Sequence, residues 1–185
     1  MGCTKVNDNN IPICRKTIKI EKLVDSILVY DCHHIYLGAK DELQLFDLKT
    51  NKISRFSQEY KGRINVLIKL KDGRLASGGQ DKLIKIWDIN TKESLMTLKG
   101  HKLMIWAMNE VSGNKLISGG SDKRILIWDL NEKKLDFELY NVKEITAVLQ
   151  LKTGKVLIGS ENNLCLFDLD TKKKLTNIEV ETGIS

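Results

Sequence analysis

Four residues in one part of the chain are of types that can do chemistry. Ser118, Asp122 and Trp128 fall within eleven residues of one another in the stretch SGGSDKRILIWDL, and His101 precedes Ser118 by seventeen. Serine, histidine and aspartate can together form an activated nucleophile and its base. Catalytic use of His101 and Ser118 therefore has to be weighed against a structural role, and the rest of the chain decides between the two.

The same stretch recurs along the chain. SGGQDKLIKIWDI begins at Ser77, and looser copies begin at Leu37 and Ile158. The aromatic residue near the end of each copy stands at position 46, 87, 128 or 167, in steps of 41, 41 and 39 residues. This period is typical of stacked repeats of one supersecondary unit. We therefore expect the four residues to belong first of all to a repeated fold.

Short β runs separated by turn residues make up each repeat. Alternating apolar and polar residues predict four strands per unit. Asp72-Gly73, Ser112-Gly113 and Thr153-Gly154 supply a tight turn after the first strand in three of the units. The third strand is apolar throughout, as in residues 125–128, which indicates cover on both faces. Such a unit predicts an all-β fold in which several four-stranded sheets stack on one another.

With these features the chain resembles the WD-repeat family of β-propellers, from about residue 15 onward. Unit three matches most fully, with Gly100-His101, Ser118, Asp122 and Trp128 at the family's positions. In the family these residue types form a buried hydrogen-bonded set, so the resemblance implies a structural role and not catalysis. Over units two and three the implied set is His101, Ser118, Asp122, Trp128, Ser77, Asp81 and Trp87.

The other units depart from this pattern. Unit two has Tyr60 where the histidine belongs. Units one and four carry Phe46 and Phe167 in place of tryptophan, and Ile20 and Asn141 in place of histidine. Phenylalanine has no hydrogen-bond donor, so we expect these two units to rely on packing.

The resemblance implies an all-β propeller of four-stranded antiparallel blades, with about four blades present and the ring incomplete. We expect a flexible arm at residues 1–14 and WD-repeat blades over residues 15–185, with units at approximately 22–62, 63–103, 104–143 and 144–181. Rings of this family usually have more than four blades. The chain is therefore expected to be a fragment of a longer propeller or to join with a second copy, because the outer faces of units one and four would expose apolar strands.

The family generally binds other proteins on the face that carries the starts of the first strands and the turns between the second and third strands. Trp106 is the residue we expect to matter most, because tryptophan and arginine dominate interface hot spots. Packing of Trp106 between blades is the alternative. Carried over by position, the expected partner-binding residues are Trp106, Met104, Arg63, Asn65, Gln80, Ser121, Glu144, Thr146 and Ser160, with Asp25 and Lys40 in unit one.

These features predict a non-enzymatic scaffold or adaptor for protein–protein interaction. The sequence has no Gly-rich phosphate loop, no paired metal ligands and no nucleophile motif, so we expect no catalytic residue, no cofactor and no enzymatic activity. The expected partners are other proteins, including a second copy or further blades that complete the ring. A nucleic-acid partner is not expected.

The net charge of +6 leaves an alternative function open. Most lysines stand in turns beside Asp and Glu, as on a solvated rim. The alternative is a peripheral membrane or polyanion-binding module, helped by acylation of Gly2 and Cys3, since two lipids anchor a protein where one does not. Val6 stands where a myristoylation signal prefers Ser or Thr.

The four cysteines predict neither a disulfide framework nor a metal site. Cys3, Cys14, Cys32 and Cys165 show no CxxC spacing. Cys32-His33-His34 lies in a predicted turn and has no second ligand pair, which is why we expect turn residues there and no metal. Without disulfides or an apolar span, a soluble cytoplasmic protein is expected.

Overall fold

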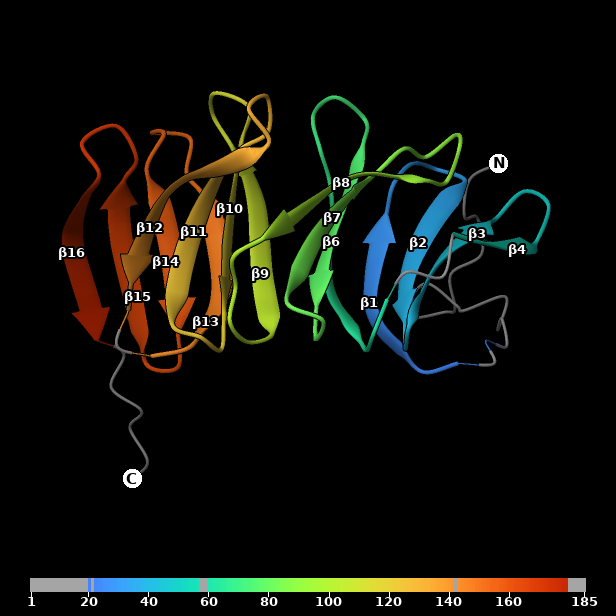
Figure 1. Cartoon of the computed structure of the whole chain (residues 1–185), viewed down its shortest axis with the longest axis horizontal. Helices are drawn as coiled ribbons and strands as arrows, with labels where there is room; N and C mark the ends of the chain where they lie inside the picture. The colour runs from blue at the N-terminus through green and yellow to red at the C-terminus, as the bar shows by residue number, and fades with distance from the viewer. Residues whose placement is uncertain (1–19, 21, 57–59, 142, 180–185) are drawn as a thin grey trace, which may run out of the picture.

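The computed structural model describes residues 20, 22–56, 60–141 and 143–179, and all the regular secondary structure within these ranges is β (Figure 1). Sixteen strands form four antiparallel four-stranded sheets, each in chain order, which we call blades one to four. Blades one and two comprise β1 (Val24–Val29), β2 (His34–Ala39), β3 (Glu42–Asp47), β4 (Lys52–Arg55), β5 (Ile64–Lys69), β6 (Leu75–Gly79), β7 (Leu83–Trp87) and β8 (Ser94–Lys99). Blades three and four comprise β9 (Ile105–Val111), β10 (Lys115–Gly120), β11 (Arg124–Asp129), β12 (Lys134–Tyr140), β13 (Ile145–Gln150), β14 (Val156–Ser160), β15 (Asn163–Asp168) and β16 (Lys173–Glu179). The expected all-β fold of four-stranded blades is confirmed.

The blades stand in a row with their first strands side by side. β1 lies next to β5, β5 next to β9, and β9 next to β13. Blade one is at one end of this row and blade four at the other, so the described strands form an open arc and not a closed ring (Figure 1). The expected incomplete ring is confirmed.

Burial along the strands follows the sequence pattern. In β11 every residue from Arg124 to Trp128 is buried, whereas every residue of β16 is exposed. The third strand of each blade is thus interior and the fourth forms the outer rim, as the apolar and lysine-rich patterns predict.

The hydrophobic core consists of three layers, one between each pair of neighbouring blades. Trp87 of blade two packs against Tyr36 and Phe56 of blade one. Trp128 of blade three packs in the same way against blade two, and Phe167 of blade four against blade three. The large aromatic residue of blades two, three and four is therefore buried against the preceding blade, and the core lies between blades.

Glycines at the ends of the second strands allow neighbouring backbones to approach closely. A Cβ atom on Gly120 would lie 2.0 Å from the carbonyl oxygen of Met104, and one on Gly79 would lie 2.0 Å from that of Arg63. Real Cβ atoms do not make such contacts, so these positions exclude other residues unless the backbone moves.

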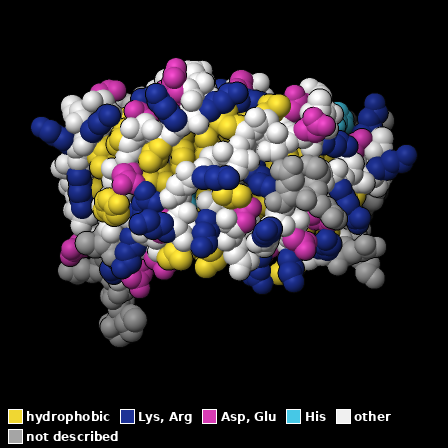
Figure 2. All heavy atoms as spheres, viewed as in Figure 1, with side chains coloured by type: hydrophobic (Ala, Val, Ile, Leu, Met, Phe, Trp, Pro, Cys, Tyr) yellow, Lys and Arg dark blue, Asp and Glu magenta, His cyan; other side chains and the backbone are white. Residues whose placement is uncertain are grey.

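Several sequence-based expectations lie outside the described residues. These are the arm at residues 1–14, the acylation of Gly2 and Cys3, and the start of the expected blade region at residues 15–19. Within the described ranges no helix is long and apolar enough to cross a membrane. The side chains of Lys and Arg are spread over the face seen in Figure 2, interleaved with acidic ones, and do not gather in one basic patch.

Candidate functional site

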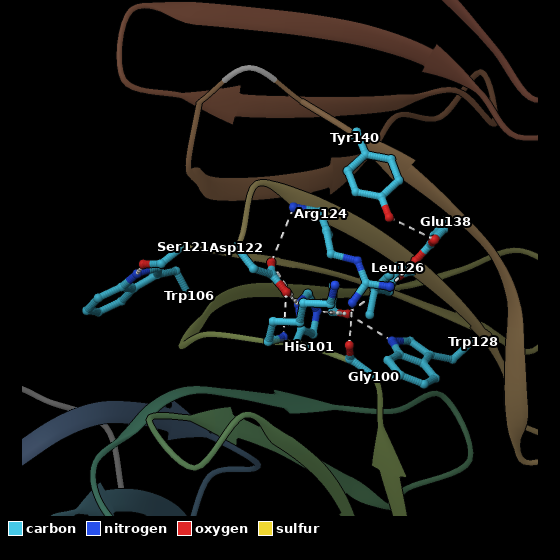
Figure 3. Close-up of polar contacts among 12 residues, drawn as sticks. Gly100, His101, Trp106, Ser121, Asp122, Arg124, Leu126, Trp128, Glu138 and Tyr140 are labelled. Atoms are coloured by element: carbon cyan, nitrogen blue, oxygen red, sulfur yellow. Dashed lines mark hydrogen bonds and ion pairs between the residues drawn. The ribbon is translucent and has the colours of Figure 1, made fainter.

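The four residues that opened the sequence analysis form one hydrogen-bonded network in blade three (Figure 3). The indole Nε1 of Trp128 donates to Ser118 Oγ over 2.8 Å, and Ser118 Oγ lies 2.8 Å from His101 Nε2. His101 Nδ1 lies 3.0 Å from an oxygen of Asp122. The network thus runs from β11 through β10 to the loop before β9 and back to the β10–β11 turn.

Burial fixes the protonation of this network. It lowers the pKa of His101 despite the neighbouring carboxylate of Asp122, so the imidazole is neutral at pH 7. Burial also acts to raise the pKa of Asp122, but the N–H groups of Lys102 and His101 outweigh it and the pKa is lowered. His101 therefore donates from Nδ1 to Asp122 and accepts the Ser118 hydroxyl proton at Nε2. Ser118 is 0% exposed and cannot meet a substrate, so the network holds the blade together.

Blade two contains a shortened form of the same network. Trp87 Nε1 donates to Ser77 Oγ over 2.8 Å, and the Tyr60 hydroxyl bonds to the same oxygen. Asp81 Oδ1 accepts the N–H of Leu83 at 3.1 Å, but its buried Oδ2 has no hydrogen-bond partner in the described part of the chain. Burial raises the pKa of Asp81, although the Leu83 N–H and the Lys85 ammonium act against it.

Among the described residues, blades one and four have no such network. Phe46 and Phe167 are buried at the tryptophan position, and the side-chain amide of Asn141 donates to the carbonyl of Lys143 over 3.3 Å. Blade one instead buries a carboxylate that the sequence analysis missed. Glu42 bonds to Gln44 and lies 3.0 Å from the ammonium of Lys22.

Arg124 is a second buried charged residue that sequence reasoning missed. Its guanidinium donates to the carbonyl of Gly100 and to the carboxylate of Glu138, and it lies 5.9 Å from the ring centre of Tyr140 (Figure 3). Nothing in the repeat marked this position, because the equivalent residue in blade two is Leu83.

The predicted partner-binding face contains the same structural feature in all four blades, a β-bulge near the start of the first strand. The register of each first strand shifts by one residue near its start, so that one residue has no partner on the second strand. A bulge of this kind re-aims a side chain, and bulges often lie beside functional sites. The residues at the bulges are Asp25, Asn65, Trp106 and Thr146.

Trp106 combines exposure with a fixed position. Its side chain is 41% exposed, and its Nε1 donates to Ser121 Oγ over 2.8 Å. Ser121 Oγ in turn donates to Glu144 Oε2 over 2.9 Å, which links blade three to the loop that enters blade four. In Figure 3 Trp106 and Ser121 lie to one side of the buried network around His101. The ring of Trp106 is therefore held at its polar edge while part of its surface remains open.

Of the other predicted residues of this face, Asn65 and Arg63 contact a neighbouring blade and the rest bond within their own blade. Asn65 Nδ2 donates to the carbonyl of Ile105 over 3.0 Å, and the exposed guanidinium of Arg63 lies 3.7 Å from Asp25. Gln80 Oε1 accepts the N–H of Arg63 at 3.2 Å. The half-buried Met104 accepts the N–H of Ser121 at its carbonyl oxygen, and Thr146 donates weakly to the carbonyl of Gly159. A hollow of about 460 Å³ adjoins this part of the face and is lined by Lys123, Lys143, Glu144, Thr146 and Glu161.

One predicted residue does not belong to this face. Ser160 is only 6% exposed and pairs with Ile145, just as Gly120 pairs with Ile105. It therefore occupies the close-approach position of the second strand and not the turn that follows. The next residue, the exposed Glu161, takes the place that Ser121 has in blade three, and it lies 3.0 Å from the ammonium of Lys143.

A possible metal-ligand group lies elsewhere, in the β1–β2 turn of blade one. Ligand atoms of Asp31, Cys32 and His33 all lie within 4.8 Å of one another, and this is the one such group found among the described residues. The sequence analysis considered Cys32-His33-His34 without Asp31, which the fold of the turn brings to the group.

Comparisons with known proteins agree with this architecture. The family described as "WD domain, G-beta repeat" matches residues 53–88 and 92–129. Each match runs from the fourth strand of one blade to the third strand of the next, so the sequence repeat straddles two blades. A search of curated proteins gave no match.

Two similar solved structures show the same fold at low sequence identity. The first, described as the crystal structure of the WD40 beta propeller domain of Doa1, is 23% identical with a TM-score of 0.70 and covers 76% of this chain and 49% of that one. The second, described as the structure of U3-55K, is 18% identical with a TM-score of 0.76 and covers 90% of this chain and 54% of that one. This chain thus spans about half the length of either structure. Residues 53–88 and 92–129 thus match the WD repeat, and the described blades have the fold of WD40 β-propellers.

Proposed function

We propose that this protein is a non-enzymatic scaffold that binds other proteins on the face around Trp106. Propellers with WD repeats generally serve as interaction scaffolds. The observation that carries the proposal is that Trp106 is 41% exposed while its indole N–H is bonded to Ser121. An exposed tryptophan that is already ordered loses little conformational entropy when a partner covers it, which favours a hot spot.

The surroundings of Trp106 support the same assignment. Ser121 and Glu144 offer polar groups beside the ring, and the hollow of about 460 Å³, which Glu144 and Glu161 help to line, gives room for a side chain of the partner. The exposed guanidinium of Arg63 lies farther along the face, in blade two. An aromatic centre with a polar rim is the usual anatomy of a protein interface.

Comparison of four versions of the protein in affinity capture tests the proposal. Trp106→Ala and Arg63→Ala should each weaken or abolish binding of the captured partners, whereas Tyr140→Ala, an exposed aromatic residue on the outer strand β12, should retain them. Thermal unfolding of each variant confirms that the blades stay folded. Retention of every partner by both Trp106→Ala and Arg63→Ala would count against this face.

A second proposed interaction rests on the open side of blade four. Leu157 and Leu166 pair across β14 and β15 at the positions that Ile117 and Ile127 occupy in blade three. The isoleucines are buried by blade four, but both leucines are partly exposed. Beside them Leu149 is 53% exposed and Ile178 51%. This side therefore has the composition of a blade interface without a blade against it.

We propose that a second copy of the chain covers this side with its blade one. Ile27 and Val29 on β1 and Ile53 on β4 are exposed and offer an apolar surface. Leu37 and Phe46 of the same blade are buried, so the expected exposure of unit one is met in part. The matched part of this chain covers 49% and 54% of the two similar solved structures, so one copy corresponds to about half of such a propeller and a second copy would add the further blades.

Light scattering at micromolar concentration tests this interaction. The protein should be a dimer, and Leu166→Lys should convert it to a monomer because a charge would be buried at the contact. Leu95→Lys, at an exposed leucine of β8, is the matched control and should leave the dimer intact. A stable, folded monomer of the unmodified protein would overturn the proposal.

A further inference from the structure

The four blades provide an internal comparison for the turn that joins their first and second strands. In blades two, three and four this turn contains a glycine with positive φ, namely Gly73 at 88°, Gly113 at 79° and Gly154 at 82°. Blade one has Asp31-Cys32-His33-His34 instead, and none of these four residues has positive φ. The turn of blade one is therefore closed in a different way.

A backbone hydrogen bond and the side chain of Asp31 together close the turn of blade one. The N–H of Tyr30 donates to the carbonyl of His34 over 2.9 Å. Asp31 Oδ1 accepts the N–H groups of His33 and His34, both at 2.8 Å. An Asx turn of this kind needs no particular side chain at the two following positions. The presence of Cys32 and His33 is thus not explained by the hairpin.

The side chains of the turn converge on its exposed surface. Cys32 Sγ lies 3.0 Å from His33 Nδ1, and an oxygen of Asp31 completes a group whose members all lie within 4.8 Å of one another. Around a tetrahedral zinc ion, sulfur and nitrogen ligands lie about 3.5 Å apart, given bonds of about 2.3 and 2.0–2.1 Å. Small rotations of three exposed side chains are enough to reach that geometry.

His34 supports the group from outside it. His34 Nδ1 lies 2.8 Å from Asp31 Oδ2, so its N–H can orient the carboxylate of Asp31, as hydrogen-bond partners of metal ligands do.

We propose that Asp31, Cys32 and His33 bind a zinc ion, with a water molecule or a residue of a bound partner as the fourth ligand. The mixture of thiolate, imidazole and carboxylate donors suits zinc and is unlike the all-oxygen sites of calcium and magnesium. Cys32 binds as the thiolate, and its proton is released to the solvent when the metal enters.

Cobalt(II) is a suitable probe, because a thiolate bonded to cobalt gives a near-ultraviolet charge-transfer band. Titration of the reduced protein with cobalt should produce this band, and zinc should remove it by displacing the cobalt. Cys32→Ser should abolish the band, while Cys165→Ser, at a buried cysteine, should retain it. Cys3 and Cys14 remain in both variants, so any cobalt binding by these two cysteines affects both spectra equally.

Two further variants measure the zinc affinity by competition with a chelator. His33→Asn should weaken zinc binding by at least about 10-fold, and His34→Asn by about 10-fold to 100-fold through the orientation of Asp31. His33 lies on an exposed turn and His34 at the half-buried start of β2, so circular dichroism should show an unchanged fold. Absence of a cobalt band in the unmodified protein, a band that persists in Cys32→Ser, or unchanged zinc affinity in His33→Asn would each overturn the proposal.

Discussion

Blades two and three both satisfy the N–H of a buried tryptophan, but their hydrogen-bond networks differ in length. In both, a buried tryptophan donates to a serine on the neighbouring strand over 2.8 Å. In blade three the serine, Ser118, is hydrogen-bonded to His101, and His101 is hydrogen-bonded in turn to Asp122. In blade two it bonds to the hydroxyl of Tyr60, and Asp81 keeps a buried oxygen without a hydrogen-bond partner in the described residues.

The difference follows from the number of polar atoms in the two side chains. Imidazole has two ring nitrogens on different edges, so His101 can bond to Ser118 and Asp122 at once. A phenol has a single hydroxyl, which Tyr60 uses toward Ser77. Satisfying the indole and the serine is thus common to both blades, whereas pairing the aspartate with the residue before the first strand is a feature of blade three alone.

The largest expected effect comes from removing the aspartate of each network. Asp122→Ala leaves the buried His101 without its acceptor and also removes the acceptor of the exposed Lys102 N–H, so it should lower the free energy of unfolding by about 2–3 kcal/mol. Asp81→Ala removes one bond, from Leu83, together with an unpaired oxygen, and should cost about 1 kcal/mol or less. Urea unfolding monitored by tryptophan fluorescence measures both. Equal losses would break the comparison between the blades.

The sequence predicted the strands and the network well, because both depend on local patterns. Strand alternation predicted four strands in each of four units, which agrees with the sixteen strands, and the Tyr60 position was aligned correctly with His101. The errors concern pairing between strands. Ser160 was placed one residue too late in its blade because small residues at 119–120 and 159–160 look alike in sequence, and only the register with Ile145 separates them.

Glu42 and Arg124 were missed for a related reason. Each is a charged residue in a strand of otherwise apolar type, and each is buried only because partners from other segments reach it. The repeat pattern does not predict a charged residue at this position of the third strand, since blade two has Leu83 there. No metal was expected at Cys32-His33-His34 because the run has no second ligand pair, and Asp31 was not considered with it; the group of Asp31, Cys32 and His33 became visible only in the structure.

A smaller effect is expected when the hydroxyl of Tyr60 is removed. Tyr60→Phe keeps the packing against Trp87 and deletes one bond to Ser77, whose oxygen still accepts from the indole. The unfolding free energy should fall by about 1 kcal/mol. Thermal unfolding of the unmodified protein, Tyr60→Phe, Ser77→Ala and the variant with both substitutions measures the coupling energy between the two residues. A double variant that loses the full sum of the single losses would show that the hydroxyls do not interact.

The two aspartates should also respond to pH in opposite directions. The pKa of Asp122 is lowered from 3.8, so its stabilisation is complete above that pH and is lost as the pH falls through the folded value. The pKa of Asp81 is raised by burial, so its ionised form costs stability above the folded value and that cost disappears as the pH falls toward 3.8. Unfolding curves between neutral pH and about pH 3 for Asp122→Asn and Asp81→Asn, each compared with the unmodified protein, should show differences of opposite sign. Differences of the same sign would contradict the assigned environments.

The smallest effect is expected where blade three carries a buried charge and blade two an apolar residue. Arg124→Leu installs the residue of blade two and removes the ion pair with Glu138 and the bond to Gly100, but it also removes a buried Nε that has no hydrogen-bond partner within the described ranges. Replacing a buried ion pair by an apolar side chain is often nearly neutral, because the charges no longer have to be desolvated. Thermal unfolding should therefore show a smaller loss than Tyr60→Phe. Arg124→Ala is the control, and its larger loss would come from the cavity it leaves beside Tyr140. A loss in Arg124→Leu as large as in Asp122→Ala would instead make the guanidinium part of the network that distinguishes blade three.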